Sequence, residues 1–125
     1  MSLHILLVED NALNSELVCA LIEAEGHRVR VVGTGAAMRQ VLKEGVCPSI
    51  ILMDILLPDV DGTTLLRELR ATANFATVPV IALTAQALAG DEERFLTAGF
   101  SVVVTKPIDT RTFMAVVERW ASPSA

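Results

Sequence analysis

The stretch from residue 49 to residue 54, SIILMD, places a run of apolar side chains directly before a single acidic one. Residues 50–53 form an unbroken apolar run, which is typical of a short strand buried on both faces of a parallel sheet. Asp54 follows at once, and a loop with Pro58 and Gly62 comes next. A carboxylate in this position lies at the edge of a sheet, so Asp54 is the first candidate for a functional residue.

The pattern of a strand followed by a helix recurs along the whole chain. Short apolar runs predict strands, and apolar residues three or four positions apart predict helices. The predicted strands span residues 3–8, 28–32, 49–53, 79–83 and 102–104. The predicted helices span residues 11–25, 63–70, 87–98 and 110–120, with one more between the cap residue Thr34 and Gly45. The first helix is marked by Leu13, Leu17, Leu21 and Ile22, and the last is expected to face inward with Phe113, Val116, Val117 and Trp120.

Strands that alternate with helices predict an α/β fold with helices on both faces of a parallel sheet. We expect a flavodoxin-like three-layer sandwich, with five helices and a five-stranded parallel sheet in the order 2-1-3-4-5. The length of 125 residues predicts a single domain, 1–125, with a core at about 3–120 and a short tail at 121–125.

Composition excludes several classes of function. The formal net charge of −5 disfavours direct binding to nucleic acid, which needs a cationic face. No apolar run approaches the ~20 residues of a membrane span, and the N-terminus lacks the pattern of a signal peptide. Cys19 and Cys47 form neither a disulfide framework nor a zinc motif. These features predict a cytoplasmic protein.

Polar residues follow four of the five predicted strands. Glu9 and Asp10 follow the first strand, Asp54 the third, Thr84 the fourth, and Lys106, after Thr105, the fifth. The carboxyl ends of parallel strands meet at one edge of a doubly wound sheet. We therefore expect three carboxylates, a hydroxyl and an ammonium group to converge.

Three carboxylates in one place repel each other, and a hard divalent cation relieves the repulsion. Magnesium prefers oxygen ligands and keeps several waters. The sequence predicts Asp10 and Asp54 as direct ligands of Mg²⁺ and Glu9 as a ligand through water. The backbone carbonyl of Leu56 is a further candidate ligand.

A carboxylate beside such a metal can attack phosphorus and form an aspartyl phosphate. The transition state spreads negative charge over three equatorial oxygens. Asp54 is the predicted phosphoacceptor, and we expect the metal to contact one of the three equatorial oxygens. Lys106 suits a second oxygen as a compact cation, and the Thr84 hydroxyl with the Ala85 backbone N–H suits the third.

Together these residues resemble the response-regulator receiver family. The family has an acidic pair after its first strand, an acceptor Asp after its third, Thr or Ser after its fourth and Lys-Pro after its fifth. Glu9-Asp10, Asp54, Thr84 and Lys106-Pro107 match these positions, and the stretch 53–62 matches the loop after the acceptor. The resemblance covers residues 3–120, and stretches 9–11, 23–27 and 90–94 are similar to stand-alone regulators of the DivK type.

The resemblance implies a signalling switch of a two-component phosphorelay and not an ordinary enzyme. A histidine kinase or a histidine phosphotransfer protein would donate the phosphoryl group, and the domain's own Mg²⁺ site would catalyse the transfer and a slow self-dephosphorylation. The resemblance also implies a cis peptide bond before Pro107. A downstream protein would bind a face formed by the fourth helix, the fifth strand and the fifth helix. The charged run 91–94 either belongs to this face or is only a solvated surface of its helix.

One position departs from the family. An aromatic residue usually stands three positions before the lysine and swings inward on phosphorylation, whereas this chain has Val103 there and contains no tyrosine. Valine cannot perform that movement, so the sequence does not explain how the switch reaches its output surface.

Two alternative functions remain open at this stage. A magnesium-dependent phosphatase would also form an aspartyl phosphate, but Leu56 stands where such an enzyme needs a second acid, and the chain is short for a substrate cap. A degenerate receiver would bind partners without phosphate, and the complete acidic set argues against it.

Overall fold

A computed structural model of the chain describes residues 2–85 and 90–121. Five strands form one parallel sheet: β1 (His4–Val8), β2 (Arg28–Val32), β3 (Ile50–Asp54), β4 (Val80–Thr84) and β5 (Val102–Thr105). Their order is β2-β1-β3-β4-β5, which confirms the predicted topology. The predicted helix start at 87–89 and residues 122–125 of the predicted tail lie outside the described residues.

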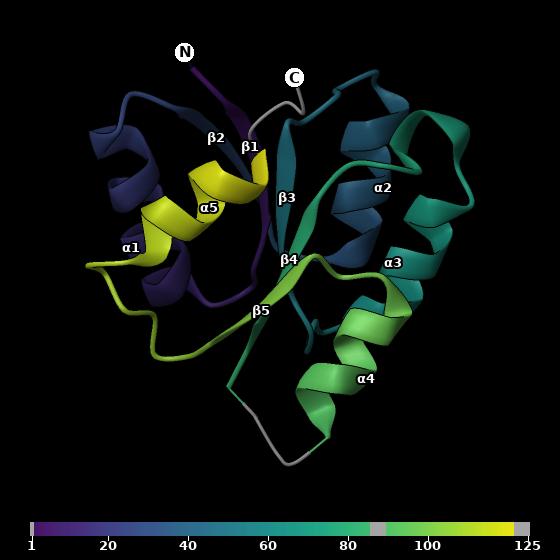
Figure 1. Cartoon of the computed structure of the whole chain (residues 1–125). Coiled ribbons are helices and arrows are strands. Elements are labelled where there is room, and N and C mark those ends of the chain that lie inside the picture. Colours follow the sequence, from purple (N-terminus) through teal and green to yellow (C-terminus); the bar gives the residue numbers. More distant parts are fainter. Residues whose placement is uncertain (1, 86–89, 122–125) are drawn as a thin grey trace.

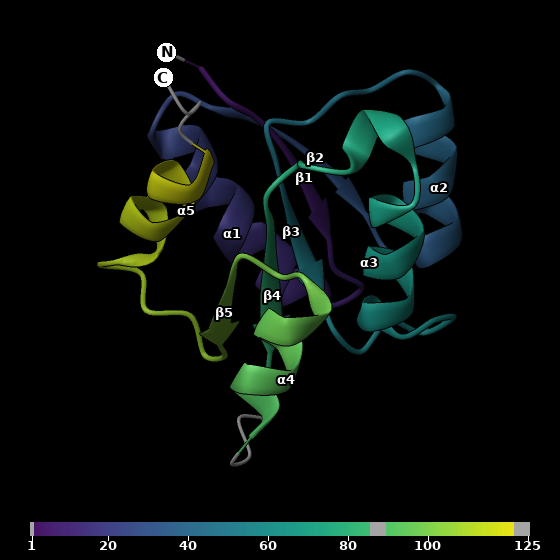
Figure 2. The same cartoon turned by 45° about the vertical axis from the view of Figure 1, so that its right-hand side comes forward.

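Helices cover both faces of this sheet (Figures 1 and 2). The helices are α1 (Ala12–Ala24), α2 (Gly35–Lys43), α3 (Gly62–Arg70), α4 (Asp91–Ala98) and α5 (Phe113–Ala121). Figure 1 shows α1 and α5 on one side of the sheet and α2, α3 and α4 on the other. Two separate clusters of buried side chains fill the two interfaces, as a three-layer sandwich requires. A short 3-10 helix, η1 (Ala73–Phe75), was not predicted.

Polar side chains mark where three of the helices begin. Asn11 accepts a hydrogen bond from the Asn14 N–H at the start of α1. Thr34 accepts one from the Ala37 N–H at the start of α2, and Asp61 caps α3. Such caps satisfy backbone donors that a helix leaves unpaired in its first turn. None of the helices within the described ranges is long and apolar enough to cross a membrane.

The face that α1 turns to the sheet differs from the simplest interpretation of its sequence. Leu13 and Leu17 are 77% and 38% exposed, whereas Val18 and Ile22 are fully buried. The spacing of Leu13 and Leu17 marked a helix correctly, but α1 carries a second apolar stripe beside theirs. Contact with the sheet buries that second stripe and leaves the first in solvent.

The prediction that Trp120 faces inward is wrong, since 39% of this residue is exposed. The buried residues of α5 are Phe113, Met114, Val117 and Ala121. Trp120 directly precedes Ala121, and neighbouring positions on a helix point about 100° apart. The indole therefore lies beside the buried stripe and not within it.

Arg70, the last residue of α3, contacts the segment that follows α3 in the chain and one segment that is distant in sequence. Its Nη1 donates to the carbonyl oxygens of Phe75 at 3.2 Å and Val78 at 2.7 Å. Its Nη2 donates to the carbonyl of Gly99 at 3.2 Å, just after α4. Burial lowers the pKa of Arg70, because the guanidinium has lost much of its water. The side chain thus fastens η1 and the end of α4 to α3.

Replacement of Arg70 by methionine should destabilise the fold by about 2–4 kcal/mol. The substitution keeps much of the apolar stem but leaves three carbonyl groups without their charged donor. Urea unfolding followed by circular dichroism measures the change. Arg67→Met is the matched control, because Arg67 lies exposed on the same helix, and we expect a change within about 0.5 kcal/mol. Equal stability of the two variants would show that the Arg70 hydrogen bonds contribute nothing.

Candidate functional site

The register of the sheet brings the predicted site residues to one edge. Val8 pairs with Met53, so Glu9 and Asp54 come next on neighbouring strands. Asp54 pairs with Leu83, one position before Thr84. Asp54 and Thr84 are themselves the last residues of β3 and β4, one position further than the predicted strand ends. Their backbones are therefore fixed by the sheet.

Three carboxylates gather at this edge, as the sequence predicted. Glu9, Asp10 and Asp54 each offer one oxygen, and these oxygens all lie within 4.8 Å of one another. Glu9 and Asp54 are only 3% and 6% exposed, whereas Asp10 is exposed. The cluster is therefore buried on one side and open to solvent on the other. Hard oxygen donors in this number suit a divalent cation such as Mg²⁺.

Lys106 joins two of these carboxylates. Its Nζ lies 2.7 Å from Oε1 of Glu9 and 3.1 Å from Oδ2 of Asp54. The backbone N–H of Lys106 donates to the Thr84 carbonyl at 2.7 Å, which fixes the lysine beside β4. The peptide bond between Lys106 and Pro107 is cis, as the family resemblance implied.

Burial and hydrogen bonds shift the pKa values of two members of this cluster. Burial raises the pKa of Glu9, and the hydrogen bond shared with Asp54 raises it further, against the opposing effect of Lys106. Burial alone lowers the pKa of Lys106, but its hydrogen bonds with Glu9 and Asp54 outweigh burial and raise it. Lys106 is therefore an ammonium ion throughout the physiological range.

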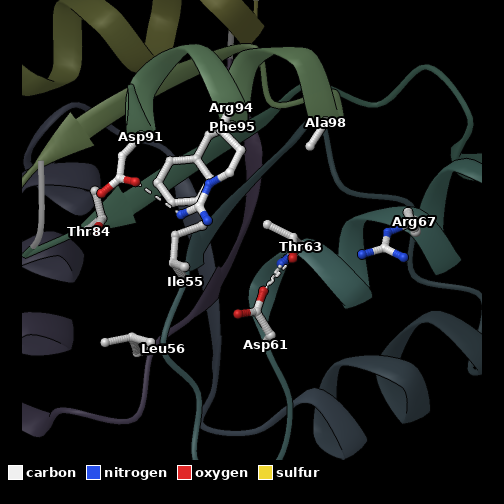
Figure 3. Close-up of a pocket in the computed structure, with 10 residues that line it drawn as sticks. All are labelled: Ile55, Leu56, Asp61, Thr63, Arg67, Thr84, Asp91, Arg94, Phe95 and Ala98. Carbon is white, nitrogen blue, oxygen red and sulfur yellow. Dashed lines mark hydrogen bonds and ion pairs between the residues drawn. The ribbon is translucent and has the colours of Figure 1, made fainter. Parts of the chain in front are cut away.

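Thr84 is the last residue of β4 and Ala85 follows it, and their contact with a phosphate stays a prediction. Thr84 is buried and lines a hollow of about 360 Å³, together with Ile55 and Phe95 (Figure 3). The hollow lies between α4 and the loop after Asp54, residues 55–61, which we call the acceptor loop. Ala85 follows directly and is exposed. In the same hollow, Arg94 of α4 lies over the Phe95 ring, and its Nη2 lies 3.1 Å from Oδ1 of Asp91. Thr84 thus belongs to the wall of a hollow that also borders α4.

The loop after Asp54 is held from two directions. The Leu56 N–H donates to Oδ1 of Asp54 at 3.1 Å, and Leu56 pairs with Asp61 in an isolated bridge. Gly62, at the start of α3, packs against the acceptor backbone: a Cβ on Gly62 would lie 2.9 Å from the Asp54 carbonyl oxygen. These contacts orient the segment that carries the Leu56 carbonyl, whose role as a metal ligand stays a prediction.

Asp59 has a positioning role that the sequence did not reveal. Its carboxylate accepts hydrogen bonds from the N–H groups of Gly35 at 2.9 Å and Ala36 at 3.1 Å. These bonds lower the pKa of Asp59, because they favour the ionised carboxylate. The acceptor loop is thereby fastened to the beginning of α2. The partners are more than twenty positions apart, so only the tertiary structure connects them.

Val103 occupies the middle of β5, where the family usually has an aromatic residue. It is half-buried and packs against the core cluster beneath α2, α3 and α4. The structure therefore gives this position a packing role.

Comparison with known proteins agrees with this arrangement. The sequence model of the response regulator receiver domain matches residues 5–118. The chain belongs to the response regulator receiver family. It is 36% identical over 120 residues to the polar-differentiation response regulator DivK of Brucella ovis, and the match covers 96% of this chain and 97% of that protein.

Solved structures show the same fold. The receiver domain of a sensor histidine kinase from Pseudomonas aeruginosa PAO1 is 39% identical, with a TM-score of 0.84 and coverage of 97% of this chain and 98% of the other. That structure has a magnesium ion coordinated in its active site cleft. A putative response regulator from Chloroflexus aurantiacus is 26% identical, with a TM-score of 0.89 and coverage of 98% and 100%.

Membership of this family places the chain among the signalling switches of two-component systems. Receiver domains of this kind interact with histidine kinases or phosphotransfer proteins. The family disfavours the alternative of an ordinary phosphatase.

Gly62→Ala should disturb the site because the new Cβ has no room. It would lie 2.9 Å from both the Asp54 carbonyl oxygen and the Ile55 Cα, and these backbone atoms must move to admit it. We expect a loss of about 1–3 kcal/mol in unfolding free energy and weaker binding of Mg²⁺, measured by calorimetry.

Gly33→Ala is the matched control for this substitution. Its Cβ would meet only ordinary contacts with Asp10 and Glu9, at 3.9 and 4.0 Å, so stability and metal binding should stay near the wild-type values. Wild-type behaviour of Gly62→Ala would show that the acceptor loop tolerates displacement.

Proposed function

We propose that this chain is the phosphoryl-accepting receiver of a phosphorelay, with Asp54 as the residue that a histidine kinase or a histidine phosphotransfer protein phosphorylates. One observation carries the proposal. The Asp54 carboxylate ends a buried strand, lies beside two further carboxylates and contacts the Lys106 ammonium at 3.1 Å. This is a nucleophile with the charges around it that phosphoryl transfer requires.

Asp10, Asp54 and the Leu56 carbonyl would hold Mg²⁺ directly, and Glu9 would hold it through water. The bound ion would neutralise charge that develops on the phosphoryl oxygens. Asp10 suits the direct contact because its carboxylate is exposed to solvent. Glu9 is buried and engaged by Lys106, which suits a contact one water further away.

In the transfer itself, an Asp54 oxygen forms a bond to phosphorus as the P–N bond to the donor imidazole breaks. The imidazole nitrogen leaves with the electron pair of that bond. Lys106 would exchange its contact with the Asp54 carboxylate for one with a phosphoryl oxygen. The Thr84 hydroxyl and the Ala85 N–H would receive another oxygen. Water would later hydrolyse the aspartyl phosphate slowly.

The new phosphoryl group would then draw Thr84 toward it. Because Thr84 lines the same hollow as Asp91 and Phe95 of α4, its movement would alter the surroundings of that helix. A local change of charge of this kind can shift the equilibrium between two conformations of a distant surface. We propose that the responding surface consists of α4, β5 and α5, where Leu96 of α4 is exposed. Val103 has no aromatic ring that could move, so the conformational change would pass through Thr84 and α4.

We further propose that the chain works as one domain, residues 1–125, and acts in the cytoplasm, where ATP-dependent histidine kinases carry out their phosphorylation.

Incubation with acetyl phosphate and Mg²⁺ tests the proposed acceptor. Intact mass spectrometry should show one added phosphoryl group on the wild type and none on Asp54→Asn. Lys106→Gln should react about a hundredfold more slowly, because a preorganised cation is lost. Removal of Mg²⁺ with EDTA should also suppress the reaction. An unmodified wild type would favour the degenerate receiver, and turnover of a small phosphate ester would favour the phosphatase.

The phosphodonor protein would approach over the start of α1. Leu13 and Leu17 are exposed there, and Leu13 follows the metal-site residue Asp10 by only three positions. A donor that brings its imidazole to Asp54 must lie against this part of the surface. Exposed leucines beside the site would lose their contact with water on docking, which favours binding.

The double substitution Leu13→Glu with Leu17→Glu should separate docking from chemistry. Transfer from a phosphorylated histidine phosphotransfer domain should slow by at least about tenfold, because two buried contacts become charged. Phosphorylation by acetyl phosphate should keep its wild-type rate, since a small donor needs no docking surface. An equal loss with both donors would show that α1 supports the site itself and not the partner.

A further inference from the structure

A second hollow lies far from the acceptor site, between α2 and α3. It has a volume of about 460 Å³, within the range of small-molecule sites in proteins. Its floor is apolar and consists of Met38, Leu42, Leu69 and Phe75. The C-terminal end of α2 contributes to it, whereas the N-terminal end of α2 faces the acceptor loop. The hollow is therefore separate from the phosphorylation site.

The rim of this groove carries an uncompensated positive charge. Arg39 of α2 and Glu68 of α3 neutralise each other through two hydrogen bonds of 2.8 Å, which also tie the two helices together. Lys43 lies one turn further along α2, is exposed, and has no counter-ion among the described residues. It is one of two lysines in a chain with a net charge of −5, and the other is Lys106 of the acceptor site. The groove thus pairs an apolar floor with a free ammonium group.

We propose that the α2–α3 groove binds a small amphipathic carboxylate, of the class of medium-chain fatty acids. The apolar body would cover Leu42 and Phe75, and the carboxylate would contact Lys43. Thr72 and Asn74 line the same groove and offer polar groups near its edge. Charge complementarity selects an anion over a cation or a neutral chain, because Lys43 is the only charged rim residue without a counter-ion in the part of the chain that the structure describes.

The site is independent of the proposed phosphoryl chemistry. None of the residues that line the groove belongs to the acidic cluster or contacts Asp54. Asp54→Asn protein should therefore bind the ligand as the wild type does, and a failure of one proposal would leave the other unaffected.

Cys47 offers a local reporter, because its thiol is exposed and lines the groove. Cys19 lies in α1 on the opposite face of the sheet and serves as an internal control. Decanoate, below its micelle threshold, should slow the alkylation of Cys47 by iodoacetamide in a saturable way. The alkylation rate of Cys19 should not change. Decylamine, with a similar chain and the opposite charge, should not protect Cys47.

Lys43→Gln should weaken the protection by decanoate about threefold to fivefold, the upper range for one exposed ion pair. Arg28→Gln removes the same charge from an exposed position on β2 and should leave the affinity within about twofold. Equal protection by decylamine, or an unchanged affinity of Lys43→Gln, would overturn the assignment of a carboxylate site. Parallel slowing of Cys47 and Cys19 would also overturn it, because it would reveal a general effect on the fold.

Discussion

The ammonium group of Lys106 between the carboxylates of Glu9 and Asp54 is the interaction on which the site depends. Glu9 and Asp54 are residues with exposures of only 3% and 6%, and their carboxylates would repel each other strongly without a cation. The lysine compensates them in the unphosphorylated protein, with Nζ at 2.7 and 3.1 Å. In the proposed function, the same group would also meet the charge of an incoming phosphoryl group.

The parallel sheet holds the residues of this cluster in fixed positions. In the order β2-β1-β3-β4-β5, the strand that carries Asp54 lies between the strand that precedes Glu9 and the strand that ends at Thr84. Backbone pairing holds each strand end within one residue of its neighbours. A loop could not fix several charged groups so closely, since its backbone has more freedom. Rigid strands thus position the charged side chains, and the loops after the strands have more freedom to move.

The segments around the site are joined by side chains that do no chemistry. Asp59 fastens the acceptor loop to the start of α2, and Arg70 fastens the end of α3 to η1 and to the turn after α4. Helix α2 therefore runs from the acceptor loop to the groove that contains Lys43.

The sequence by itself determined the α/β class and the candidate site, because unbroken apolar runs define buried parallel strands and polar residues directly after them must meet at one edge. The strand order was predicted from the usual topology of five such strands and not from the residues themselves. It did not determine which face of α1 is buried or where Trp120 points, since helical spacing alone leaves neighbouring stripes equivalent until a sheet covers one of them. It also gave no sign of the hydrogen bonds between Asp59 and the start of α2, the Arg70 contacts or the groove between α2 and α3. These join residues that no local pattern relates, and only the packing of the folded chain brings them together.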